Sequence, residues 1–154
     1  MREQGFGHIV NTASIAGLIP MCGLLSYSAA KHAVVGLSTS LRIEAELVGV
    51  RVSVLCPGAV ETAIVGGGKF GKQLQPVPEI IQRQIWEKAR PMAPDAFARQ
   101  ALDAIAKNKA VIVMPWRWRV LWWLYRICPN LAVALVRRQF LATKKLVENN
   151  LPAS

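Results

Sequence analysis

Tyr27 and Lys31 are the residues whose types and spacing most directly suggest chemistry. They lie four positions apart in a stretch that predicts a helix, so both side chains share one helix face. An ammonium group beside a phenol favours the phenolate by charge attraction, which makes Tyr27 a candidate general acid or base. The pair alone is weak support for a site, because tyrosine and lysine are common and most such pairs are ordinary surface residues.

The elements around this pair follow the order strand, helix, strand. Three ranges predict them: residues 7–14 for the first strand, 26–48 for the helix and 50–55 for the second strand. Ser26 is the expected N-cap of the helix, and Gly49 ends it. This order predicts a βαβ unit with a right-handed crossover.

Hydroxyl side chains follow both predicted strands. Ser14 closes the first strand, and Thr62 comes after the Pro57–Gly58 pair that stops the second. Because α/β proteins bind ligands beyond the carboxyl ends of their strands, we expect Ser14, Tyr27 and Thr62 to converge there. A serine that holds a carbonyl oxygen, a tyrosine that delivers a proton and a loop that shapes a cofactor site would suit carbonyl chemistry.

Three motifs, in this order and spacing, resemble those of the short-chain dehydrogenase/reductase family. They are Ile9-Val10-Asn11-Thr12-Ala13-Ser14, Tyr27-Ser28-Ala29-Ala30-Lys31 and Pro57-Gly58-Ala59-Val60-Glu61-Thr62. The resemblance covers roughly residues 1–115. It implies an oxidoreductase that transfers a hydride between NAD or NADP and a small alcohol or ketone, without distinguishing the two cofactors or naming the substrate.

The resemblance also implies a role for each matching residue. Ser14 would orient the substrate oxygen, Tyr27 would donate or accept the proton, and Lys31 would support Tyr27 and hold the nicotinamide ribose. The remaining cofactor-lining positions that it implies are Pro57, Gly58, Val60 and Thr62. The intact family member is expected to be a homo-oligomer.

The motifs of the family's first half have no counterpart in this sequence. The family carries a glycine-rich Thr-Gly-x-x-x-Gly-x-Gly turn, an Asn-Asn-Ala-Gly segment and a catalytic Asn ahead of the motifs found here. We therefore expect an α/β fold that corresponds to the C-terminal part of a Rossmann-like, mostly parallel, doubly wound sheet. Its first strand would have an unpaired edge, and the chain alone would not bind a dinucleotide with useful affinity.

The chain divides into two predicted regions. Residues 1–115 would form a partial NAD(P)-binding domain, with a substrate loop at about 62–94, and residues 116–154 a helical extension. The ranges expected within the later part of the first region are a short helix near 79–90, a helix after Pro94 with Asp95 as N-cap, and a strand at 110–114.

Positive charge concentrates in the extension. The chain has a formal net charge of +10, and residues 116–154 hold seven Lys and Arg residues against the single acid Glu148. Residues 116–126 interleave aromatic residues with arginine, and the spacing from Leu131 onward predicts a basic amphipathic helix. This helix could lie on the protein body, on a dimer partner or on an anionic membrane; nucleic acid is a weaker alternative.

Composition excludes other classes. A chain with 53% hydrophobic and 18% charged residues is not disordered. Three widely spaced cysteines, with no Cys/His cluster, indicate neither a disulfide framework nor a metal site. We expect a cytoplasmic protein, or one peripheral at the membrane. The alternative to an enzyme is a non-catalytic fragment or membrane-surface interaction protein that keeps the motifs as a relic.

Overall fold

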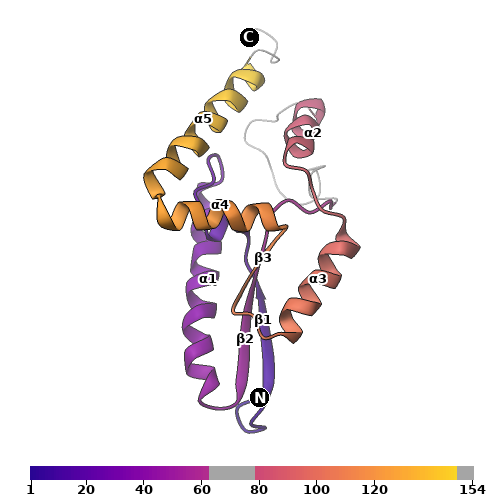
Figure 1. The fold of residues 1–154 in the computed structure, drawn as a ribbon, viewed down its shortest axis with the longest axis vertical. Coiled ribbons are helices and arrows are strands. Elements are labelled where there is room, and N and C mark those ends of the chain that lie inside the picture. The colour runs from indigo at the N-terminus through magenta and orange to yellow at the C-terminus, as the bar shows by residue number, and fades with distance from the viewer. Residues whose placement is uncertain (63–78, 149–154) are drawn as a thin grey trace.

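The computed structural model describes residues 1–62 and 79–148, with side chains at 1–62 and 83–148 (Figure 1). The elements in chain order are β1 (Gly7–Thr12), η1 (Ile15–Gly17), α1 (Leu25–Glu46), β2 (Val50–Pro57), α2 (Glu79–Lys88), α3 (Pro94–Ala106), β3 (Val111–Met114), α4 (Trp116–Ile127) and α5 (Pro129–Glu148). The predicted strand, helix and strand over residues 7–55 are thus confirmed, as is the strand near 110–114.

The strands form one parallel sheet in the order β1-β2-β3. β1 aligns with β2 from Gly7 opposite Val50 to Thr12 opposite Leu55. β3 is shifted towards the carboxyl end of β2, where Pro57 lies opposite Met114. This is the expected α/β class, with parallel strands joined by helices.

Helices cover both faces of the sheet. Side chains of a strand alternate between faces, and in β2 Val52 packs with Leu41 of α1, whereas Leu55 packs with the cluster that includes Ala101 and Ala104 of α3. Figure 1 shows α1 and α3 on opposite sides of the strands. Burial on both faces explains why the strand segments are rich in Val and Ile.

α1 begins one residue earlier than expected, and its N-cap is Leu24 rather than Ser26. The Ser28 backbone N–H donates to the Leu24 carbonyl (2.8 Å), so the helical pattern is already running at Ser26. α1 ends at Glu46, two residues earlier than expected, with Leu47 as its C-cap, and Gly49 lies in the turn that follows. Its φ of +72° suits glycine, and a Cβ there would lie 2.0 Å from the Gly5 carbonyl oxygen.

The N-cap of α3 also differs from the expected Asp95. The cap is Ala93, and Pro94 is the first helical residue. Proline suits that position because its fixed φ is helical and its missing N–H has no partner in a first turn. Asp95 lies in the first turn, where a carboxylate interacts favourably with the helix dipole.

Hydrogen bonds join the strands near their amino ends, away from the carboxyl edge where Ser14 lies. Ser53, which is fully buried on β2, donates from Oγ to the Lys109 carbonyl just before β3 (2.8 Å). Its only hydroxyl hydrogen is then used, so His8 of β1 donates from Nε2 to Ser53 Oγ (2.8 Å). On α1, Arg42 donates to the carbonyls of Val52 and Asn108. These bonds cross all three strands and fix α1 to the sheet.

α4 and α5 follow β3 in the chain. α4 crosses the carboxyl edge of the sheet, and α5 runs on from it away from the strands (Figure 1). The inward side of α4 packs on the core through Trp118, Leu121, Trp122 and Tyr125. None of the helices in the described ranges is long and apolar enough to cross a membrane.

Candidate active site at the carboxyl edge of the sheet

Ser14 stands where β1 ends. The Ala13 N–H donates to the Leu55 carbonyl (2.7 Å), which extends the contact with β2 by one residue. Ser14 is extended (φ −169°) and caps η1, because its Oγ accepts from the Ala16 N–H (3.2 Å). That bond uses an oxygen lone pair, so the hydroxyl hydrogen of Ser14 remains available for a ligand oxygen.

Lys31 connects α1 with the end of β1. Its Nζ donates to the Thr12 carbonyl (3.1 Å), two residues before Ser14, and lies 5.6 Å from the centre of the Tyr27 ring. The residue spacing led us to expect the contact with Tyr27. The hydrogen bond to Thr12 was not predicted, because a backbone carbonyl is present at every residue and no residue type marks it as an acceptor. The predicted end of the first strand was the one feature of the sequence that indicated the position of this carbonyl.

Tyr27 lies on the first turns of α1, at the same edge of the sheet. Its side chain is 43% exposed, and its hydroxyl has no hydrogen-bond partner among the described residues. An ammonium has three donors, and Lys31 uses one of them on Thr12. The two side chains therefore offer a free phenol and two free N–H donors to a bound molecule.

Close packing of η1 on α1 holds this geometry. A Cβ placed on Gly17 would lie 2.5 Å from the Lys31 carbonyl oxygen and 2.8 Å from its carbonyl carbon. Only glycine allows the two backbones to approach this closely. The segment that follows Ser14 is thus pressed against the turn of α1 that carries Lys31.

Cys56 of β2 lies beneath the site. Burial raises the pKa of its thiol to about 12, while a hydrogen bond from the Ser14 backbone and the charge of Lys31 act in the opposite direction. These opposing influences place the end of β2 beside Ser14 and Lys31. With no exposed surface and a raised pKa, Cys56 is a core residue and not a nucleophile.

The segment after β2 carries the other residues that the resemblance singled out. The Gly58 N–H donates to the Met114 carbonyl at the end of β3 (2.8 Å), and Val60 pairs with Met92 ahead of α3. Thr62 is exposed. Pro57 thus ends β2, and Gly58, Val60 and Thr62 follow it at the same edge as Ser14. Residues 63–78 of the expected substrate loop lie outside the described residues.

Trp118 of α4 covers Gly58. A Cβ on Gly58 would lie 2.1 Å from Trp118 Cδ1, so the indole fills the space that any other side chain would need. Trp118 Nε1 is buried without a hydrogen-bond partner among the described residues. Trp118 was not among the residues expected at this edge of the sheet, because nothing in the order of residues links position 118 to position 58.

A parallel sheet with helices on both faces and a polar site at its carboxyl edge is the arrangement of Rossmann-like nucleotide-binding folds. Residues 1–69 match the family model described as short chain dehydrogenase. Together with the relatives described next, this match places the chain in the short-chain dehydrogenase/reductase family, as its three motifs predicted.

Similar proteins extend the match beyond residue 69. The chain is 30% identical to retinol dehydrogenase 10 of Homo sapiens, over 97% of its own length and 44% of that protein's. A structure of a short-chain dehydrogenase/reductase from Burkholderia phymatum with NAD is 29% identical and covers 85% of this chain and 51% of that one (TM-score 0.68). A short-chain dehydrogenase from Sphingobium yanoikuyae with NADPH is 27% identical, covering 78% and 43% (TM-score 0.57). The chain spans less than half the length of the retinol dehydrogenase relatives that it matches.

Proposed function

We propose that this chain supplies the acid–base half of an NAD(P)-dependent oxidoreductase that interconverts an alcohol and a carbonyl compound. The observation that carries the proposal is the position of Lys31 Nζ, which bonds to the end of β1 and lies against Tyr27. The proposed catalytic residues are Ser14, Tyr27 and Lys31. This proposal agrees with the family and with the NAD and NADPH found in the two similar structures.

The residues present fit one end of a nicotinamide dinucleotide. The free donors of Lys31 and the exposed Tyr27 suit the hydroxyl groups of a ribose. Gly58 does not offer an open surface, because the Trp118 indole lies on it. A ring that contacts Gly58 therefore requires Trp118 to move. We propose that Pro57, Val60 and Thr62 line the cofactor along this side.

The protein residues would divide the work of the reaction. The bound cofactor supplies or accepts the hydride. In the reducing direction Tyr27 gives its hydroxyl proton to the substrate oxygen as charge develops there, and in the oxidising direction it takes that proton back. Ser14 donates a hydrogen bond to the same oxygen. Lys31 holds Tyr27 by its charge and fixes the end of β1 through Thr12.

We further propose a lipophilic alcohol or ketone as substrate and a homo-oligomer as the intact protein. The relative named for retinol oxidation matches nearly the whole chain. α1 exposes large apolar side chains, including Leu37 and Ile43. Such a surface is typical of association sites. Residues 1–115 and 116–154 would act as a catalytic unit and an accessory helical unit.

A second proposal concerns location: a cytoplasmic protein that contacts an anionic membrane surface through its extension. Arg137, Arg138 and Lys145 of α5 line one open hollow, and Leu131 and Phe140 of the same helix are exposed. A relic that binds membranes without catalysis would share this surface. A membrane-associated enzyme and a non-catalytic relic differ in whether they turn over substrate, and the following experiment measures that turnover.

The test is turnover by this chain joined behind the glycine-rich half of the Burkholderia phymatum relative. Retinol and medium-chain alcohols and ketones are supplied with NAD(H) or NADP(H). We expect turnover, and we expect Ser14→Ala to lower kcat about 100-fold or more because it removes a donor to the developing oxyanion. Ser40→Ala, an exposed change on α1, is the control. A hybrid that folds and binds cofactor but is inactive with every substrate would favour the relic.

A further inference from the structure

The outward face of α4 is a narrow apolar strip. Trp116, Val120, Trp123 and Ile127 follow one another at helical spacing, so they share one side of the helix. Each is more than half exposed, from 52% for Trp123 to 72% for Ile127. The opposite side of α4 is packed on the core through Trp118 and Trp122, so the helix cannot turn this strip inward without losing that packing.

Positive charge flanks the strip. Arg119 is exposed beside it, and Arg126 lies over the rings of Trp122 and Trp123, with its guanidinium carbon 5.4 Å and 5.8 Å from the ring centres. Residues 116–147 contain no acidic residue, and Glu148 lies 3.6 Å from Lys144. Within α4 and most of α5 the apolar strip is therefore bordered by cations, whereas near its first residue Asp103 of α3 lines a hollow together with Trp116 and Arg119.

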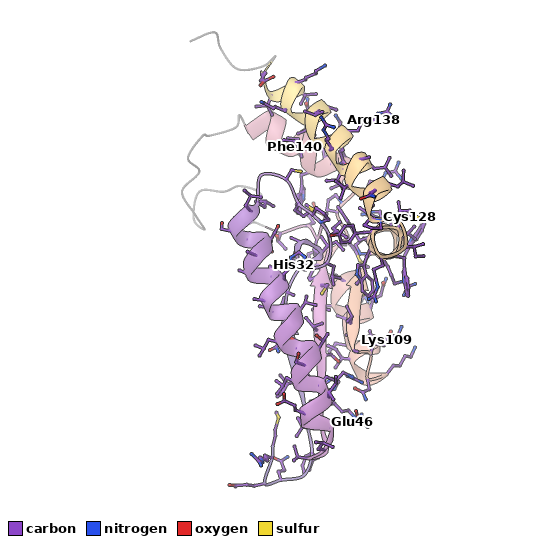
Figure 2. All side chains as sticks on the ribbon, turned by 90° about the vertical axis from the view of Figure 1, so that its left-hand side faces the viewer. His32, Glu46, Lys109, Cys128, Arg138 and Phe140 are labelled. Carbon is purple, nitrogen blue, oxygen red and sulfur yellow. The ribbon has the colours of Figure 1, made fainter. Side chains whose placement is uncertain are left out.

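α5 extends the same chemistry. It rises from Cys128 away from α1 and the strands, and carries Arg138 and Phe140 (Figure 2). Its basic residues lie on one arc, and apolar residues such as Leu131 and Phe140 remain more than 40% exposed. Aromatic and aliphatic side chains with flanking Arg and Lys match the interface of an anionic bilayer, where phosphates lie above hydrocarbon.

We propose that the apolar strip of α4 inserts into the interface of an anionic membrane. The delivery of a substrate from this membrane to Tyr27, described below, rests on the proposed function. α4 crosses the carboxyl edge of the sheet, and its Trp118 covers Gly58 at the site. The helix that enters the membrane would then be the helix that borders the active site. A lipophilic alcohol or ketone dissolved in the bilayer would reach Tyr27 without crossing water.

The test is co-sedimentation of the purified chain with vesicles of phosphatidylcholine alone or with phosphatidylglycerol added, at low and high salt. We expect binding to the phosphatidylglycerol vesicles, weakened by salt, with a blue shift of tryptophan fluorescence. Ile127→Glu should lower the partition coefficient at least about tenfold, because it removes an inserted aliphatic side chain and adds a negative charge. Leu47→Glu is the matched control: it makes the same kind of change at a residue 87% exposed near the far end of α1.

Three results would overturn the inference. The first is no binding of the unchanged chain to anionic vesicles at low salt. The second is equal loss of binding in Ile127→Glu and Leu47→Glu. The third is a dimer in sedimentation equilibrium that Ile127→Glu dissociates while vesicle binding is unchanged. That result would show that the strip joins two copies of the chain and does not enter a membrane. The vesicle experiment measures no turnover. A negative result would therefore leave the proposed role of Tyr27 unchanged, because the turnover of the hybrid protein tests that role separately.

Discussion

At the scale of single residues, the site depends on polar groups that the fold leaves without partners. Tyr27 has a free hydroxyl, Lys31 keeps two donors after bonding to Thr12, and Ser14 keeps its hydroxyl hydrogen. Elsewhere in the described chain, side chains such as Ser53 and Arg42 donate hydrogen bonds to backbone carbonyls. Because this edge of the sheet is partly exposed, these donors are free to bond to water or to a ligand oxygen, as the proposed site requires.

His8 predicts a specific pH dependence of stability. Its pKa is lowered from the ordinary 6.5, first by burial and then by the charges of Arg51 and Arg42, so the fold favours neutral His8. As pH falls below about 6.5, the unfolded chain takes up this proton more readily than the folded chain, and the free energy of unfolding decreases. Urea unfolding of the wild type and of His8→Gln across this range should show a smaller loss in the variant. Identical pH profiles would contradict this role for His8.

At the scale of elements, two close backbone approaches hold α1 against its neighbours. Gly17 lets η1 touch the Lys31 carbonyl, and Gly49 lets the end of α1 meet Gly5. The positions of the strands and helices followed from hydrophobic periodicity and from glycine and proline. The caps of α1 and α3 did not, because Ser26 and Asp95 are good cap residues by type, whereas the path of the chain places each inside the first turn.

The glycines of η1 and α1 provide a matched pair of substitutions. Gly17→Ala places a Cβ against backbone atoms of Lys31 that cannot move aside, and we expect a loss of about 1–3 kcal/mol in the free energy of unfolding. Gly36→Ala, within α1, meets nothing within 4 Å and should stabilise by about 0.5–1 kcal/mol, because alanine favours helix. Denaturant unfolding measures both. A Gly17→Ala variant as stable as the wild type would show that the η1–α1 contact is looser than described.

At the scale of the whole molecule, the described sheet ends at β1, which pairs only with β2 among these residues. Val10, on the face of β1 turned away from α1, is 37% exposed. The helical nature of residues 116–148 was predicted from the sequence, but the placement of α4 over the site was not. That placement depends on the long-range contact between Trp118 and Gly58, which neither periodicity nor a motif records.

Dinucleotide affinity is the prediction that belongs to this scale. The sequence has no glycine-rich Thr-Gly-x-x-x-Gly-x-Gly turn, and Trp118 lies on Gly58. We therefore expect calorimetric titration of the 154-residue chain with NADH and NADPH to show binding weaker than the micromolar range, because the sequence lacks the glycine-rich turn that presents a helix N-terminus to the phosphates. Micromolar binding would show that the chain forms a cofactor site by itself.

The account rests above all on Tyr27 as the proton carrier, and the chain offers its own control because it has only two tyrosines. In the hybrid described under Proposed function, Tyr27→Phe should lower kcat about 100- to 10,000-fold while the affinity for NAD(P)H is kept. Tyr125→Phe, which removes the same hydroxyl from the core-facing side of α4, should leave kcat within a few-fold of the unchanged hybrid. A Tyr27→Phe hybrid that turns over at the unchanged rate would contradict the assignment of this site.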